Sequence, residues 1–345
     1  MGGDNPVTVQ SMTSTHTCDI DTTIAQINQM TQAGCELVRV AVPNPQDTAA
    51  LGDIIKASPV PIIADVHFHY KRAIEAIEAG VVKIRLNPGN IQDRNHVNEV
   101  IAACKANGTA IRIGVNEGSI IESKDKQLRQ QERTRPLPEL MVEKMREYLD
   151  IFDSCNFDQL VLSAKCHDAA TTIAVNRLIA KTFDLPIHLG VTHAGLPATG
   201  SVRSAVAMGA LLAEGIGNTI RVSLAGDPVN EINVGWEILT SLNLRKSWKP
   251  ELIVCPTCGR CEVNLLEMAE KVEKALAGVR KPLTIAVMGC VVNGPGEAAD
   301  ADLAICGGKN KVAIYKGGQL LSTAPCDEGI AILLQEINKM VTESK

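Results

Sequence analysis

The chain has 345 residues, and 34 Lys and Arg against 39 Asp and Glu give a formal net charge of −5. Hydrophobic residues make up 45% and charged residues 21%, which is typical of folded globular proteins and excludes a disordered chain. Aromatic residues make up only 3%, and this scarcity together with the acidic balance argues against nucleic-acid binding. No apolar run reaches the length of a membrane span, and residues 1–4 carry no secretory signal pattern, so we expect a cytoplasmic protein without membrane contact.

Eight short runs rich in β-branched residues alternate with helical periodicity over the first 225 residues. The predicted strands are 7–12, 37–42, 61–67, 83–87, 110–116, 159–165, 186–192 and 219–224, and the clearest helices are 22–30, capped by Asp21, and 201–212. No GxGxxG turn follows the first strand. This α/β pattern predicts a closed (β/α)8 TIM barrel rather than an open doubly wound sheet.

The barrel pattern ends near residue 240, and a different composition follows it. We predict a substrate-binding barrel domain over 1–240, a linker over 241–252 and a small α/β domain over 253–345. Within the second domain the predicted strands are 252–255, 283–288, 302–305 and 311–315, and the predicted helices are 265–277 and 329–341.

A polar stretch over 117–135 contains nine charged residues and follows the fifth predicted strand. It would lie on the barrel face where active sites form, which makes it a candidate lid. A solvated surface insertion explains the same composition equally well.

Charged side chains alternate with apolar ones along the predicted barrel strands. Because the apolar set packs under the helices, the polar set points into the lumen. This places five cations there, with Asp65 as the clearest acid: Arg39, Arg85, Arg112, Lys165 and Arg221. Unpaired cations in a low-dielectric lumen are costly, so a ligand with two phosphate groups resolves the conflict. The competing interpretation is that these residues form internal salt bridges or extend into solvent beyond the strand ends.

The loop 194–201 is rich in glycine and opens a predicted helix, which is a favourable place for an anion. A tight turn needs the same residues, so the loop alone is a weak signal.

Eleven cysteines, an odd number in a long chain without a signal sequence, form a poor disulfide framework. Most of those before residue 250 stand singly among small apolar residues, as buried thiols do. Cys255, Cys258 and Cys261 form a CxxCxxC run, and Cys290 lies in a Gly- and Pro-containing segment, 288–297. From spacing alone, a structural zinc and an iron–sulfur cluster remain equally open.

Motifs along the whole chain resemble the 4-hydroxy-3-methylbut-2-en-1-yl diphosphate synthase family. They are Val9-Gln-Ser-Met-Thr13, Ala64-Asp-Val-His-Phe68, Arg85-Leu-Asn-Pro-Gly-Asn90, Ile111-Arg-Ile-Gly-Val-Asn116, Cys255-Pro-Thr-Cys258 and Met288-Gly-Cys-Val-Val-Asn-Gly-Pro-Gly-Glu-Ala298. The resemblance is to the short bacterial form, in which a barrel is followed directly by a cluster domain.

This resemblance implies reductive ring opening of 2-C-methyl-D-erythritol 2,4-cyclodiphosphate in the methylerythritol phosphate route to isoprenoids. It implies a [4Fe–4S] cluster on Cys255, Cys258, Cys290 and Glu297, with flavodoxin or ferredoxin as electron donor and a head-to-tail homodimer. The implied catalytic residues are Glu297, Asp65, His67 and Lys165. The implied substrate-binding residues are Arg39, His67, Arg85, Asn87, Arg112, Asn116, Lys165, Arg221 and Ser223.

Three features depart from the family pattern. His193 stands where the family normally carries Glu, and Cys261 is an additional thiol that we interpret as a bystander. The chain also begins late relative to the family, without its N-terminal hairpin, so we expect a truncated start. Two alternatives remain: a pterin-type transferase like dihydropteroate synthase, which leaves the cysteines unexplained, and a zinc- or cluster-containing phosphate-ligand-binding barrel without reductase activity.

Overall fold

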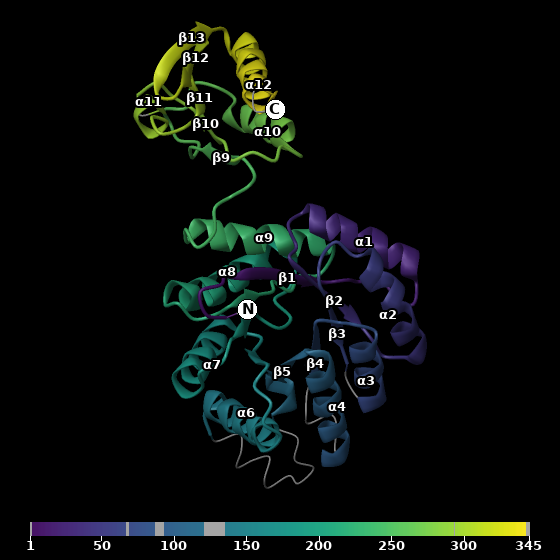
Figure 1. Cartoon of the computed structure of the whole chain (residues 1–345). Coiled ribbons are helices and arrows are strands. Elements are labelled where there is room, and N and C mark those ends of the chain that lie inside the picture. Colours follow the sequence, from purple (N-terminus) through teal and green to yellow (C-terminus); the bar gives the residue numbers. More distant parts are fainter. Residues whose placement is uncertain (1, 67–68, 87–92, 121–134, 293, 343–345) are drawn as a thin grey trace. The chain divides into compact units, whose positions relative to one another are not determined.

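The computed structural model describes residues 2–66, 69–86, 93–120, 135–292 and 294–342. The chain divides into two compact units, Met1–Arg245 and Lys246–Lys345, each described by itself below (Figure 1). No helix among the described residues is long and apolar enough to cross a membrane.

The first unit is a parallel eight-stranded barrel, which confirms the predicted fold class. Its sheet has the order β6-β5-β4-β3-β2-β1-β8-β7, and an isolated parallel bridge between Leu162 and Ile187 joins the two end strands. The strands are β1 (Thr8–Met12), β2 (Leu37–Ala41), β3 (Ile62–Asp65), β4 (Lys83–Leu86), β5 (Ala110–Asn116), β6 (Leu160–Lys165), β7 (His188–Leu189) and β8 (Thr219–Ile220).

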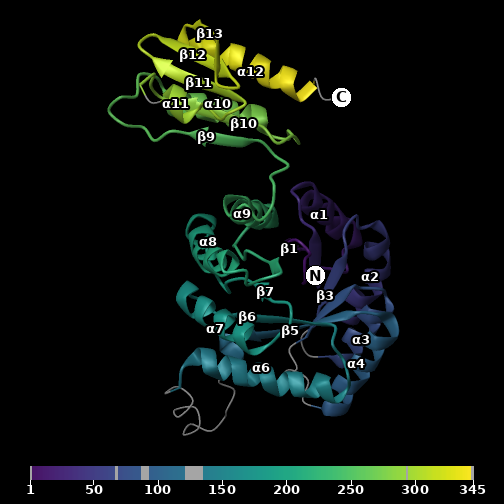
Figure 2. The same cartoon turned by 60° about the vertical axis from the view of Figure 1, so that its left-hand side comes forward.

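Helices surround the barrel strands on the outside (Figures 1 and 2). They are α1 (Ile20–Gln32), α2 (Pro45–Ala57), α3 (Tyr70–Glu78), α4 (Arg94–Asn107), α6 (Leu137–Ser154), α7 (Ala169–Thr182), α8 (Pro197–Ala213) and α9 (Pro228–Ser241), with a 3-10 turn at Glu117–Ser119. The outward strand residues, such as Val38, Ile84 and Ile113, are fully buried beneath this layer. The alternation in the sequence therefore separates a helix-facing set from a lumen-facing set.

Several predicted element ends differ from the structure. Asp19, not Asp21, caps α1, because its carboxylate accepts a hydrogen bond from the Thr22 amide. Helix α8 starts at Pro197, four residues earlier than predicted, as the fixed φ of proline favours the first helical position. The ladder between β7 and β8 is also shorter than predicted, and beyond it an isolated parallel bridge joins Gly195 and Leu224.

The second unit is a mixed five-stranded sheet with the order β13-β12-β11-β10-β9. Its strands are β9 (Glu251–Val254), β10 (Thr284–Met288), β11 (Leu303–Gly308), β12 (Lys311–Lys316) and β13 (Gln319–Ala324), of which the first three are parallel. Its helices are α10 (Leu265–Leu276), the short α11 (Gly294–Glu297) and α12 (Cys326–Thr342). Strand β13 was missed by the sequence prediction, although Gly317 and Gly318, both at positive φ, form a recognisable hairpin turn before it.

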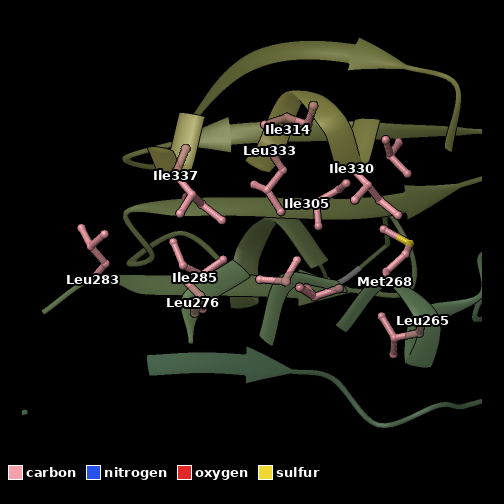
Figure 3. Packing of buried hydrophobic residues seen from close by; sticks show 14 residues of the cluster. Leu265, Met268, Leu276, Leu283, Ile285, Ile305, Ile314, Ile330, Leu333 and Ile337 are labelled. Carbon is pink, nitrogen blue, oxygen red and sulfur yellow. The ribbon is translucent and has the colours of Figure 1, made fainter. Parts of the chain in front are cut away.

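Apolar side chains of the sheet pack against α10 and α12 to form the core of this unit (Figure 3). Ile305 of β11 and Leu333 of α12 are fully buried within it. The core fixes the parallel strands β9, β10 and β11 side by side, so their carboxyl ends lie at one edge of the sheet. Cys255 follows β9, and Cys290 follows β10 at that edge.

Candidate functional site

A cavity of about 230 Å³ lies in the barrel lumen and is lined by inward-facing strand residues. Its lining consists of Arg39, Asp65, Arg85, Arg112, Gly114, Asn116, Ser163, Lys165, Thr192, His193, Arg221 and Ser223. Seven of the nine predicted substrate-binding residues are among them, together with Asp65. The other two, His67 and Asn87, lie outside the described residues.

The carboxylate of Asp65 lies between two of the lumen arginines. Its Oδ2 is 3.8 Å from Nε of Arg39, and its Oδ1 is 3.5 Å from Nη1 of Arg85. The Asp65 side chain is 6% exposed, so these pairs are weakly screened by solvent. Asp65 therefore holds two cations in place from the neighbouring strands.

A second acid, missed by strand parity, reaches the lumen from helix α9. Glu231 accepts hydrogen bonds from Nε of Arg221 at 3.2 Å, from the Ser11 hydroxyl at 2.7 Å and from the Leu224 amide at 3.0 Å. Strand parity could identify only Asp65 because Glu231 comes from a helix. Glu231 lies in the first turn of α9, and nothing in the sequence around it distinguishes it from a surface residue.

Positive charge still exceeds negative charge in the described part of the lumen. Only two described carboxylates, those of Asp65 and Glu231, are available to six cations: Arg39, Lys83, Arg85, Arg112, Lys165 and Arg221. The Nε and Nη1 atoms of Arg112 are buried and have no hydrogen-bond partner among the described residues. Leaving such donors unmatched is expensive, so the arrangement favours a bound polyanion.

Burial lowers the pKa of three of the cations that line the cavity. Desolvation brings the pKa of Arg39 to about 10, and desolvation followed by repulsion from Arg112 lowers the pKa of Lys165 well below its ordinary value. Loss of solvation also lowers the pKa of Arg112, with repulsion from Arg39 next in size. An anion in the cavity would stabilise the charged forms of these side chains and so raise their pKa values again.

Two further buried side chains, those of Lys83 and His188, lie at the first residues of β4 and β7. Neither was assigned a role from the sequence. Burial lowers the pKa of Lys83 from 10.5 to about 7, with Arg112 as the second cause. His188 is fully buried, its Nδ1 lies 2.6 Å from the Thr219 hydroxyl oxygen, and burial holds its pKa well below the ordinary value. The ring is therefore neutral at neutral pH.

His193 lies at the cavity rim, where its backbone adopts a left-handed conformation with φ of 54°. A non-glycine residue rarely takes this conformation, so the turn is unusual at this point. The loop 194–201, all of it described, contributes no lining residue to the cavity. Helix α8 begins there without a side-chain cap.

The candidate lid, 117–135, lies mostly outside the described residues, which resume at Arg135. Its described start is anchored by Glu117, whose Oε2 lies 2.7 Å from Nδ1 of His167. This contact raises the pKa of His167.

Cysteine side chains gather around Gly289 in the second unit. The Gly289 amide donates a hydrogen bond to Sγ of Cys255 at 3.1 Å. A Cβ at Gly289 would lie 2.7 Å from Sγ of Cys261 and 3.6 Å from Sγ of Cys255, so only glycine leaves room for both thiols. Amide donors to sulfur are a known device for tuning iron–sulfur centres.

Electrostatic interactions link three further thiols, Cys258, Cys290 and Cys306. Cys258 is exposed, and hydrogen bonding to Arg260 lowers its pKa, against a smaller opposing effect of Cys290. Cys306 is buried, and desolvation, then Cys290 and Cys255, raise its pKa to about 11. The described residues contain no group of three His, Cys, Asp or Glu side chains placed to hold a single metal ion.

Glu297 is the last residue of α11, and its side chain lies outside the described part of the structure. Cys255, Cys258 and Cys290 are all free thiols with some exposure. Softness of the three sulfurs, together with the amide donor on Cys255, fits an iron–sulfur cluster.

Known proteins resemble this chain over both units. A profile described as "GcpE TIM-barrel domain" matches residues 1–236, and one described as "GcpE protein C-terminal domain" matches residues 251–339. A protein of Geobacter sulfurreducens is 47% identical over 343 residues, covering 99% of this chain and 96% of the relative. One from Lawsonia intracellularis is 46% identical over 344 residues, covering 99% and 94%. Both relatives bear the name 4-hydroxy-3-methylbut-2-en-1-yl diphosphate synthase (flavodoxin).

Among solved structures, a dihydropteroate synthase from Stenotrophomonas maltophilia aligns with a TM-score of 0.49 and 12% identity. The alignment covers 69% of this chain and 92% of that one. A likeness of this size carries no conclusion about activity.

Proposed function

The chain belongs to the GcpE family of 4-hydroxy-3-methylbut-2-en-1-yl diphosphate synthases, and from this premise we propose its reaction and its site. It is an iron–sulfur oxidoreductase that opens the ring of 2-C-methyl-D-erythritol 2,4-cyclodiphosphate and releases water, giving 4-hydroxy-3-methylbut-2-enyl diphosphate in isoprenoid biosynthesis. The observation that carries the proposal is the lumen cavity, where buried cations outnumber carboxylates among the described residues.

The substrate's two phosphoryl groups bind to the lumen cations. Arg112 lines the cavity and binds phosphate oxygens there, while Asp65 orients Arg39 and Arg85 as forked donors. Glu231 fixes Arg221 at the opposite wall of the barrel. Because these groups are already held by the strands, binding requires little reorganisation. Asn116, Ser223, His67 and Asn87 complete the proposed substrate-binding set.

Proton handling falls to Lys165, Asp65 and His67 in this proposal. Lys165 is the group best suited to donate, because desolvation and neighbouring cations lower the pKa of its ammonium. A departing hydroxyl needs such a donor to leave as water. Negative charge that develops on the substrate is stabilised by the arginines around it.

A [4Fe–4S] cluster would be held by Cys255, Cys258, Cys290 and Glu297. When bound, it would supply two electrons one at a time. The carboxylate differs from the thiolates because a hard, weakly held ligand is easily exchanged at iron. The Gly289 amide donates a hydrogen bond to Cys255, and the absence of a side chain at Gly289 leaves room for this thiol. We interpret Cys261 as a bystander, since its Sγ lies 3.2 Å from the Val263 carbonyl oxygen and donates to it.

The partners follow from the same premise. The names of the relatives support flavodoxin as electron donor, with ferredoxin as the other candidate. We further propose a head-to-tail homodimer acting in the cytoplasm. The alternative of a phosphate-binding barrel without reductase activity is less well supported, because curated relatives sharing 45–47% identity are named as the synthase.

Anaerobic purification followed by metal analysis and turnover tests the proposal. We expect brown protein containing iron that converts the cyclodiphosphate only when a reductant is supplied. Colourless protein with one zinc per chain and no turnover would overturn the reductase assignment.

A further inference from the structure

Two glycines on the lumen side of the barrel lie directly against cationic head groups of the preceding strand. A Cβ placed on Gly114 in β5 would lie 3.0 Å from Nε and 3.6 Å from Cζ of Arg85 in β4. A Cβ on Gly190, just beyond β7, would lie 2.7 Å from Nζ of Lys165 in β6 and 2.6 Å from the Arg221 carbonyl oxygen. In both places a cationic head group occupies the space that a side chain on the glycine would need.

Backbone conformation does not explain these glycines. Neither Gly114 nor Gly190 has a positive φ, so any residue could adopt the same backbone. Glycine inside a strand weakens it and often marks a close approach of another group. Here the approaching groups are the Arg85 guanidinium and the Lys165 ammonium.

The strand register shows how Arg85 comes to lie over Gly114. Arg85 is paired with Arg112 across the β4–β5 ladder, and Gly114 is the next residue of β5 on the same lumen face. The guanidinium can therefore lie against the β5 backbone while its Nη1 stays 3.5 Å from Asp65. Arg85 and Gly114 both line the cavity, so a bulkier residue would displace the head group into it.

We propose that Gly114 is a positioning residue for phosphate recognition, which keeps the Arg85 guanidinium flat against the barrel wall and the cavity open. Gly190 provides the same space for Lys165, with an added backbone contact that makes it less suitable for substitution. This inference rests on the proposed function, because it assigns the held arginine to the substrate's phosphates.

The test is a double-mutant cycle of Gly114→Ala and Arg85→Ala, read out by calorimetric binding of inorganic diphosphate and by steady-state kinetics with the cyclodiphosphate. We expect R85A to weaken diphosphate binding by about 10–100-fold, the range for loss of a charged hydrogen bond. G114A should weaken it by about 3–10-fold, since the guanidinium is displaced rather than lost. In G114A, KM should rise while kcat changes little. In the R85A background, adding G114A should have no further effect.

Gly52→Ala serves as the matched control, because a Cβ at Gly52 meets no atom within 4 Å. If G114A alone fails to fold, the proposal requires the R85A/G114A double variant to fold, since the conflicting side chain is gone. Unchanged diphosphate affinity in G114A, or an equal loss with and without Arg85, overturns the inference. Unchanged affinity in R85A instead overturns the proposed phosphate site itself.

Discussion

The barrel lumen and the cysteine edge of the second unit hold their functional groups in opposite ways. In the lumen, charged side chains project from strands, are almost fully buried, and are held by carboxylates from β3 and α9. At the cysteine edge, thiols lie on loops after β9 and β10, and Cys258 is exposed. The comparison teaches that the lumen groups are fixed by the barrel strands and by buried carboxylates, whereas the thiols lie on loops of the second unit. We therefore expect a variant in the barrel lumen and a variant at the cysteine edge to impair function independently of each other.

Removal of the proposed carboxylate ligand should have the largest effect. Glu297→Ala is expected to abolish turnover, because no exchangeable ligand remains at the proposed cluster. Diphosphate affinity, measured by calorimetry, should stay at the wild-type value, since the barrel is untouched. Full activity in this variant would show that no labile carboxylate is needed.

Arg112→Leu should produce the converse failure. We expect substrate binding to weaken by about 1.5–3 kcal/mol, the scale of hydrogen bonds to charged groups, while iron content stays unchanged. Equilibrium binding of the cyclodiphosphate and iron analysis check the two halves of this statement. An unchanged affinity would place Arg112 outside the phosphate site.

Lys83→Met should show how much the buried charge of Lys83 destabilises the folded barrel. Since burial lowers the pKa of Lys83 from 10.5 to about 7, the unfolded chain binds a proton there that the folded chain releases between these pH values. This group therefore destabilises the fold fully below pH 7, and the penalty disappears as the pH rises to 10.5. By calorimetry without ligand, the variant should melt higher than the wild type at pH 7, and this difference should shrink steadily as the pH rises toward 10.5. A constant difference across this range would contradict a titrating Lys83.

His193→Glu should have the smallest effect. The side chain lies at the cavity rim on an unusual backbone, so a carboxylate there can reach the same space without disturbing the buried arginines. Turnover is expected to be equal or higher in steady-state assays. A fall would show that the imidazole has its own role in this protein.

Strand parity correctly identified the lumen residues because side-chain alternation is a local property of each strand. Arg39, Arg85, Arg112, Lys165 and Arg221 all line one cavity, as their alternation with apolar neighbours predicts. The same reasoning underestimated internal pairing, since Glu231, the partner of Arg221, comes from helix α9 and not from a strand. It also missed β13, where only the Gly317–Gly318 turn signals a further strand.

Two kinds of information are thus distinguishable in this protein. The amino-acid order alone determined the barrel alternation, the inward direction of the cations and the spacing of the cysteine motifs, because periodicity and short motifs act over a few residues. Tertiary structure decided which acid holds which arginine, where Gly114 and Gly190 leave room for cations, and which thiols meet at Gly289. Those outcomes depend on contacts between different strands, helices and loops, and such contacts exist only once these elements have packed.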